Sequence, residues 1–207
     1  MACKVQKAPT ITKISLVECV REIVDLGTKK NKELVDYIFE FIESELTVGR
    51  RFPIVDAGRI AVRVKNSRPG RNPKTGEDIE VTSRLSIKMG KAKVKSSDAL
   101  LVDGRLSTRE EFREALRSKF SITGQQASDI HFMFSDKIAR IPETLGRMEI
   151  RGFGSFFAKE VSSRKGRNPK TGDVVEIAET VKSEFKASKD MRIRIQNAGH
   201  YGAFPVA

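Results

Sequence analysis

The stretch Gly70-Arg71-Asn72-Pro73-Lys74-Thr75-Gly76 occurs a second time, unchanged, as Gly166-Arg167-Asn168-Pro169-Lys170-Thr171-Gly172. The two copies lie 96 residues apart in a chain of 207 residues, and the same offset aligns their flanks without a gap. Leu16, for example, aligns with Phe112. A period of this length is too long for a solenoid repeat, so it indicates a duplicated domain.

Two stripes of apolar residues open each copy and predict two amphipathic helices. The stripes of the first copy comprise Leu16, Val20 and Val24, then Leu34, Ile38 and Ile42; those of the second comprise Phe112, Leu116 and Phe120, then Ile130, Phe134 and Ile138. The spacing of apolar residues then becomes alternating, which predicts strands. Gly58 and Gly154 lie between two strand runs, where a turn needs a positive φ.

Helix starts are marked by threonines that can cap free backbone N–H groups. Thr12 and Thr108 stand at the N-cap position of the first helix of each copy. Thr108 with Glu111, and Thr123 with Gln126, have the spacing of a capping box. Each copy therefore has the predicted order helix, helix, strand, strand, projecting arm, strand.

The sequence thus predicts an α+β fold made of two tandem units. We expect the two units to pack against each other within one chain as a pseudo-dimer. The predicted boundaries are an N-terminal flexible extension (1–11), a first repeat (12–95), a connector (96–107), a second repeat (108–196) and a C-terminal tail (197–207).

Charge and composition limit the classes of function. The net charge is +12, and residues 50–95 hold 13 Lys or Arg against 4 Asp or Glu. This excess favours a polyanion as partner, and it falls on predicted strands and loops, which is unlike a basic helix on a membrane surface. No apolar run reaches the roughly 20 residues of a membrane helix, and the N-terminus lacks a secretory apolar region. Cys3 and Cys19 do not form a disulfide framework, so we expect an intracellular chain.

The heptapeptide has the chemistry of a turn, because Pro fixes φ, Asn can cap its own backbone and a terminal Gly accepts left-handed geometry. One alternative is an ordinary exposed hairpin tip. Against it, the sequence is unchanged where the rest of the repeat has diverged, cations flank it, and it holds no apolar residue that would tie it to a core. Arginines suit the narrow minor groove of DNA, and a compact Pro can wedge between base steps.

With these residues, the chain resembles the bacterial HU and integration host factor family over roughly 12–95 and 108–191. Gly152-Phe153-Gly154-Ser155-Phe156 followed by the second heptapeptide is the most specific match. That family is a dimer whose two arms embrace DNA. The resemblance implies that Pro73 and Pro169 intercalate, that Arg68, Arg71, Arg164 and Arg167 line the minor groove, and that Lys13 and Arg109 contact phosphates. The remaining expected DNA-binding residues are Lys65, Asn72, Lys74, Lys159, Lys165, Asn168 and Lys170.

Two departures from the family pattern affect these expectations. The first copy has Asp56-Ala57-Gly58-Arg59-Ile60 where the second has its Phe-bearing turn, so its hydrophobic anchor is weakened. Lys91–Lys95 and Met191–Ile195 both alternate with period 2, which favours strands over the family's C-terminal helix. The sequence therefore leaves open whether each C-terminal segment is a helix or a strand, and with it the phosphate contact that the family's helix makes.

The sequence lacks the residues that a phosphate loop, a catalytic site or a metal site would need. The heptapeptide is one residue too long for a phosphate loop and lacks its Lys-Ser/Thr ending. No Ser/His/Asp set or paired-carboxylate pattern indicates an enzyme, and we expect no cofactor or small-molecule substrate. A metal site would need partners for His131, and His200 is the only other histidine, so we expect none.

The prediction is an architectural protein that bends or compacts double-stranded DNA, largely without sequence preference. It would act in the cytoplasm on a nucleoid, a plasmid or a viral genome. A variation is self-association of two chains, which gives four arms. The alternative is a structural or interaction module that kept the fold and binds polyanions only weakly.

Overall fold

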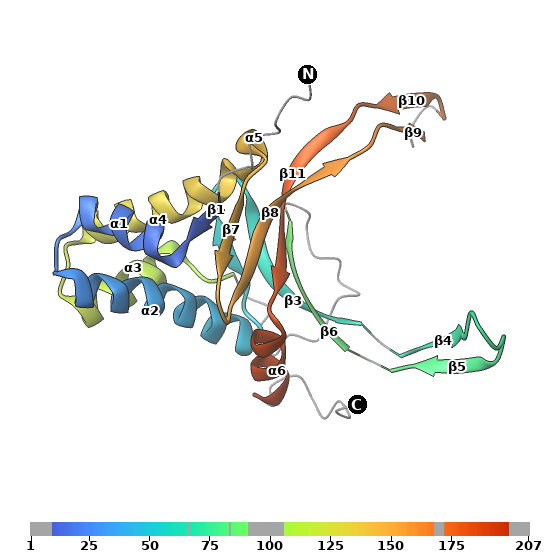
Figure 1. Cartoon of the computed structure of the whole chain (residues 1–207), viewed down its shortest axis with the longest axis horizontal. Coiled ribbons are helices and arrows are strands. Elements are labelled where there is room, and N and C mark those ends of the chain that lie inside the picture. The colour runs from blue at the N-terminus through green and yellow to red at the C-terminus, as the bar shows by residue number, and fades with distance from the viewer. Residues whose placement is uncertain (1–9, 66, 83, 91–105, 168–171, 199–207) are drawn as a thin grey trace, which may run out of the picture.

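The computed structural model describes residues 10–65, 67–82, 84–90, 106–167 and 172–198 (Figure 1). The predicted order helix, helix, strand, strand, arm, strand is confirmed in both repeats, whereas the elements Thr10–Thr12, Ile141–Thr144 and Lys189–Asn197 were not predicted. In the first repeat, elements are β1 (Thr10–Thr12), α1 (Lys13–Ile23), α2 (Thr28–Thr47), β2 (Phe52–Ile54), β3 (Gly58–Lys65), β4 (Arg68–Arg71), β5 (Asp78–Val81) and β6 (Arg84–Gly90). In the second repeat they are α3 (Arg109–Phe120), α4 (Gly124–Ala139), α5 (Ile141–Thr144), β7 (Arg147–Ile150), β8 (Gly154–Val161), β9 (Arg164–Arg167), β10 (Val174–Ile177), β11 (Thr180–Ala187) and α6 (Lys189–Asn197).

The helices begin where the capping residues predict. Thr108 accepts from the backbone N–H of Glu111, whose carboxylate accepts from the backbone N–H of Thr108. Thr123 and Gln126 form the same reciprocal pair at the start of α4. Thr12 occupies the N-cap position of α1 but makes no capping hydrogen bond with its side chain. Both predicted boxes are therefore confirmed, and α1 has a weaker start than α3.

Each repeat contributes an antiparallel sheet to the body. Strands β2, β3 and β6 form one sheet, and β7, β8 and β11 form the other, which β1 extends by pairing in parallel with β7. The turn glycines have the expected positive φ, +112° at Gly58 and +155° at Gly154. Helices cover one side of these sheets, and the arms leave from the other (Figure 1).

The apolar residues of both repeats form one buried core. Helix α1 contacts α4, helix α2 contacts α3, and strand β6 contacts β11. The ring of Phe39 lies 5.6 Å from that of Phe134, and the ring of Phe52 lies 5.6 Å from that of Phe112. Aromatic residues of one repeat therefore pack directly on those of the other, with edge-to-face geometry.

The strand expected over Met191–Ile195 is wrong, because these residues lie in helix α6. Ser188 caps this helix by accepting from the backbone N–H of Met191 at 3.0 Å. Met191 and Ile195 are fully buried, whereas Ile193 is 43% exposed. The apolar residues therefore follow the i, i+4 spacing of a helix, and Ile193 alone produced the period of 2. Lys91–Lys95, the matching segment of the first repeat, lies outside the described residues.

Several of the predicted domain boundaries lie next to residues that the structure does not describe. Thr10 and Ile11, which the sequence assigns to the flexible extension, belong to strand β1. At the end of the expected connector, Leu106 forms a bridge with Arg51, and the backbone N–H of Ser107 donates to the Arg51 carbonyl. The rest of the extension and most of the connector and tail, residues 1–9, 91–105 and 199–207, lie outside the described residues.

The turn between the first two strands differs between the repeats as the sequence suggests. Phe153 is buried, with its ring 5.0 Å from that of Phe39 and 5.3 Å from that of Phe185. Ala57 holds the matching position in the first repeat and is only partly buried. Asp56 precedes it with a φ of +61°, a left-handed conformation that Asp tolerates better than most residues with a Cβ. The first turn is therefore less anchored than the second.

Candidate nucleic-acid interface

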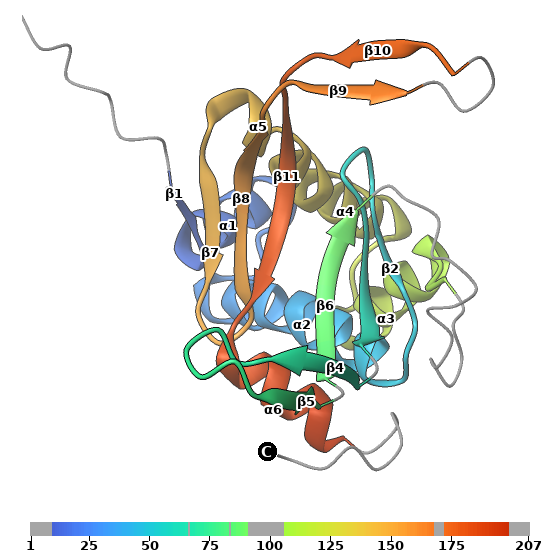
Figure 2. The same cartoon turned by 90° about the vertical axis from the view of Figure 1, so that its right-hand side faces the viewer.

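Two β-ribbons form the arms, and both project from the side of the body that the helices leave open (Figure 1). In the first arm β4 pairs with β5, from Arg68 opposite Val81 to Arg71 opposite Asp78. In the second arm β9 pairs with β10, from Arg164 opposite Ile177 to Arg167 opposite Val174. The two registers are identical once the offset of 96 is applied. Viewed from the arm side, the arms stand at opposite ends of one face (Figure 2).

The tip of the first arm is a compact turn held by its own backbone. The N–H of Gly76 donates to the carbonyl of Asn72 at 2.8 Å, and the N–H of Asn72 donates to the carbonyl of Glu77 at 2.9 Å. The Asn72 side chain accepts from the N–H of Lys74 at 3.0 Å, and Gly76 has a φ of +76°. These bonds leave Pro73 exposed on the turn.

Arg71 lies at the base of this tip, where its Nε donates to the Gly76 carbonyl at 2.6 Å. Arg68 and Lys74 are exposed on the same arm, and Lys65 is exposed at the end of β3. In the second arm Arg164, Lys165 and Arg167 are likewise exposed. Asn168, Pro169 and Lys170, which form the predicted second tip, lie outside the described residues.

One face of each arm carries two β-branched apolar residues beside an arginine, Arg68 or Arg164, which the sequence analysis did not anticipate. In an antiparallel pair, opposite residues share a face, so Gly70 lies with Ile79 and Val81, and Gly166 lies with Val175 and Ile177. A Cβ on either glycine would come within 2.9 Å of the side chain of Val81 or Ile177. The glycine therefore leaves room for the neighbouring β-branched side chain. The signal in the sequence was the alternation Ile79-Glu80-Val81, repeated as Val175-Glu176-Ile177.

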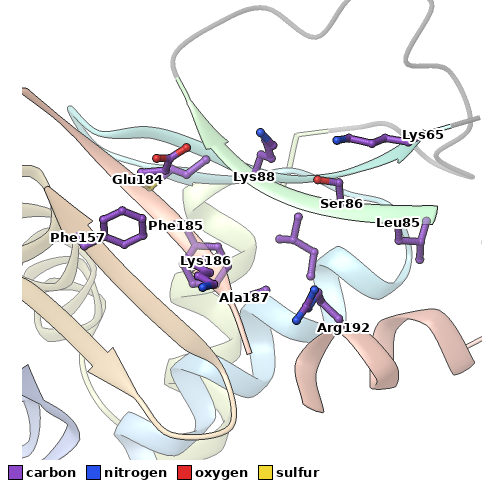
Figure 3. A pocket seen from close by; sticks show the side chains of 12 residues that line it. Lys65, Leu85, Ser86, Lys88, Phe157, Glu184, Phe185, Lys186, Ala187 and Arg192 are labelled. Atoms are coloured by element: carbon purple, nitrogen blue, oxygen red, sulfur yellow. The ribbon is translucent and has the colours of Figure 1, made fainter. Parts of the chain in front are cut away.

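A hollow between the arms forms the floor of the candidate site. Strands β6 and β11 lie side by side there, one from each repeat (Figure 2). Lysines and an arginine line the hollow together with one acidic side chain (Figure 3). The charged residues are Lys65, Lys88, Lys186, Arg192 and Glu184.

Three of these cations, Lys88, Lys186 and Arg192, were missed by the sequence analysis. They come from two sheets and a helix whose meeting depends on tertiary structure, so their spacing along the chain carries no signal. Lys159, which was predicted, lies beside the hollow and pairs with Glu184 at 2.9 Å. Arg192 belongs to helix α6. The helix that the sequence did not predict therefore contributes a cation to this face.

The two predicted phosphate contacts at helix starts lie in the helical layer. Lys13 begins α1, where its ammonium pairs with the carboxylate of Asp36 in α2. Partial burial lowers the pKa of Lys13, with the nearby charge of Lys32 acting in the same direction and that of Glu40 opposing it. Arg109 is exposed at the start of α3. The structure brings neither side chain to the floor between the arms.

His131 is buried between the repeats, with its ring 5.2 Å from that of Phe112 and 6.1 Å from that of Phe52. Burial lowers its pKa, the charge of Arg109 adds to the effect, and a hydrogen bond with the backbone of Pro53 opposes it. Within the described ranges, no group of three or more His, Cys, Asp or Glu side chains could hold a metal ion. No helix in those ranges is long and apolar enough to cross a membrane.

Comparison with known proteins gives matches in both halves of the chain. A family model described as bacterial DNA-binding protein matches residues 11–96 and again residues 107–196. Integration host factor subunit alpha of Polaromonas naphthalenivorans (strain CJ2) is 40% identical over 81 residues, which are 39% of this chain and 66% of that protein. The same subunit of Halorhodospira halophila (strain DSM 244 / SL1) is 38% identical over 104 residues, or 49% of this chain and 98% of that protein.

Among solved structures, a cocrystal structure of HU with DNA from Anabaena is similar over 43% of this chain and 97% of that chain, with 31% identity and a TM-score of 0.40. Each of the two integration host factor subunits matches less than half of this chain. The subunit from Halorhodospira halophila, matched over 98% of its length, therefore corresponds in size to one repeat.

Proposed function

The chain belongs to the bacterial DNA-binding protein family, and from this membership and the geometry of the arms we propose that it binds and bends double-stranded DNA. The proposed role is architectural and involves no catalysed reaction. It would be exerted on a nucleoid, a plasmid or a viral genome, largely without sequence preference.

The observation that carries the proposal is the arrangement of cations on one face. Two arms with exposed arginines stand at opposite ends of that face, and the floor between them is lined by Lys65, Lys88, Lys186 and Arg192. DNA carries one phosphate charge per about 1.7 Å of helix axis. A duplex lying across the floor would therefore place phosphates against the body while the arms follow its grooves.

Each arm has the features needed in a minor groove. Arg68 and Arg71, like Arg164 and Arg167, suit the negative potential of a narrow groove. Pro73 stands exposed on its turn, where its compact ring can enter between base steps, and Pro169 has the same place in the second heptapeptide. Unstacking a step costs a few kcal/mol, which the additional contacts of a bent duplex offset.

We further propose that one chain supplies the whole binding unit. The shared core of the repeats and the contacts of α1 with α4 and of β6 with β11 support this intrachain pseudo-dimer. A single chain then presents both arms, where the family's two-chain dimer needs two.

The proposal is tested by gel shift on linear, nicked and four-way-junction DNA of equal length across a salt series. We expect tighter binding to the nicked and four-way-junction DNA, because both lower the cost of bending. We also expect a steep fall of affinity with salt, since each neutralised phosphate contributes roughly −0.9 to the slope of log K against log salt.

Heparin and duplex RNA serve as controls in the same series. Equal affinity for heparin, RNA and linear DNA, with no preference for nicked DNA, would refute DNA bending. That outcome would support the alternative of an interaction module with weak polyanion binding.

A further inference from the structure

The floor between the arms carries opposite charges at matching positions of the two repeats. Lys88 pairs with Ala61 in the first sheet, and Glu184 pairs with Phe157 in the second. The offset of 96 relates both members of these pairs. A lysine in one repeat thus corresponds to a glutamate in the other, and both side chains line the same hollow (Figure 3).

The difference extends over the whole face that these residues share. Because alternate residues of a strand share a face, the registers assign Arg59, Arg63, Lys65 and Lys88 to this face in the first sheet. In the second sheet this face carries Arg147, Lys159, Lys182 and Lys186 together with Glu149 and Glu184. Among the described side chains, the first repeat therefore offers four cations to the face, and the second offers four cations and two carboxylates.

Glu184 lowers the positive charge of the second repeat by one unit. Its carboxylate also binds the ammonium of Lys159 at 2.9 Å, so that this lysine already has an anionic partner. The side chain of Glu184 is 24% exposed, so the pair is partly shielded from solvent. A phosphate approaching the second sheet meets a carboxylate and a lysine that is already paired, whereas one approaching Lys88 meets an exposed cation.

We propose that Glu184 makes the two halves of the floor unequal, so that the first repeat binds phosphate charge more strongly than the second. A bent duplex whose two flanks differ in phosphate charge is then bound in one preferred orientation, with the more highly charged flank on the first repeat. This inference rests on the proposed DNA-bending function and adds a direction to it.

The test uses a duplex whose two flanks differ only in charge. A central nick fixes the site of bending, and uncharged methylphosphonate linkages replace several phosphates on one flank. The orientation is measured with an iron–EDTA cleavage agent tethered to a single cysteine on one arm. Matched positions are Asp78→Cys and Val174→Cys, which the offset of 96 relates, in a background with Cys3 and Cys19 replaced by Ser.

One additional phosphate contact at 0.1 M salt is worth roughly eightfold in affinity, so we expect a cleavage bias of several-fold. The Asp78→Cys tether should cut mainly the native flank, and the Val174→Cys tether mainly the uncharged flank. The charge exchange Lys88→Glu with Glu184→Lys keeps the net charge and should reverse or abolish the bias. The milder Glu184→Gln, which preserves shape, should reduce the bias and steepen the salt slope by about 0.9.

The outcomes separate the inference from the proposed function. Equal cutting of both flanks by both tethers, in complexes that still prefer nicked DNA, would overturn the role of Glu184 and leave the bending function intact. An unchanged bias in Glu184→Gln would overturn it as well. If the unmodified protein shows no preference for nicked over linear DNA, the bending function itself is refuted.

Discussion

Pro73 is one of the two prolines through which we propose that the protein bends DNA. Its turn is closed by backbone hydrogen bonds of Asn72, Gly76 and Glu77, in which the Pro73 ring takes no part. Removal of the ring should therefore leave the arm folded and its charge unchanged.

We therefore expect Pro73→Ala to reduce DNA bending more than it reduces affinity, and Pro169→Ala to act in the same direction. The wedge costs unstacking energy as well as stabilising the kink, so its removal should change Kd by less than about tenfold. Bending is measured by energy transfer between the ends of a labelled duplex. Pro69→Ala, in strand β4 of the same arm, is the matched control, and an equal loss of bending in that variant would contradict the wedge.

His131 illustrates what a sequence cannot show about one residue. Its position beside an apolar stripe was visible, but its place between Phe52 and Phe112 depends on the pairing of the repeats. Within the described structure its Nε2 is buried and has no hydrogen-bond partner. Its counterpart in the first repeat is Val35, which is also buried.

The lowered pKa of His131 predicts a loss of stability in mild acid. The folded state keeps the ring neutral, while the unfolded chain takes up a proton as the pH falls below about 6.5. Stability is therefore fully present above that value and decreases below it. His131→Leu should lose less stability than the parent between pH 7.5 and pH 5 in chemical denaturation, and equal losses would contradict the prediction.

At the scale of elements, the capping residues of α3 and α4 gave the most reliable predictions of where a helix begins. Thr108 and Thr123 were predicted from spacing alone, since a capping box involves only residues three apart. Thr12 has the same place at the start of α1, yet its hydroxyl lies 3.3 Å from that of Ser15 and caps no backbone group. A threonine at the N-cap position therefore does not by itself ensure a capping hydrogen bond.

This difference gives a matched pair of substitutions. Thr108→Ala should lower the free energy of unfolding by about 1 kcal/mol, because it removes the bond to the N–H of Glu111. Thr12→Ala should cost only a few tenths of that amount. Both values come from urea denaturation, and a larger loss in Thr12→Ala than in Thr108→Ala would refute the assignment.

The turn between β7 and β8 offers a second matched pair. A Cβ at Gly154 would lie 2.5 Å from the carbonyl oxygen of Lys186, whereas one at Gly152 meets nothing within 4 Å. Gly154→Ala should therefore destabilise the fold by about 3 kcal/mol. Gly152→Ala, with a φ of +81°, should cost about 1 kcal/mol. Similar melting temperatures for the two variants would contradict this packing.

Helix α6 is the element for which the sequence predicted the wrong secondary structure. A short run with apolar residues at every second position fits a strand, and it also fits a helix when only Met191 and Ile195 face the core. Packing made the choice, because Arg194 of α6 binds Glu43 of α2 at 2.8 Å and the carbonyl of Gly152 at 3.0 Å. That contact joins residues 151 apart, a separation at which local periodicity has no influence.

At the scale of the whole molecule, the repeat predicted the order of the elements that the two halves share, but not β1, α5 or α6. The floor between the arms could not be predicted, because Lys88, Lys186 and Arg192 meet only when β6, β11 and α6 pack together. The charges that a duplex would meet are thus a property of the assembled pair of repeats.

The central claim is that one chain of 23.1 kDa, with two arms, bends one duplex. It is tested most directly by energy transfer between the ends of a nicked duplex in a complex whose mass is measured in parallel by sedimentation. We predict one chain per duplex and a clear approach of the two ends. A straight duplex in that complex, or bending only when two chains are bound, would contradict the account.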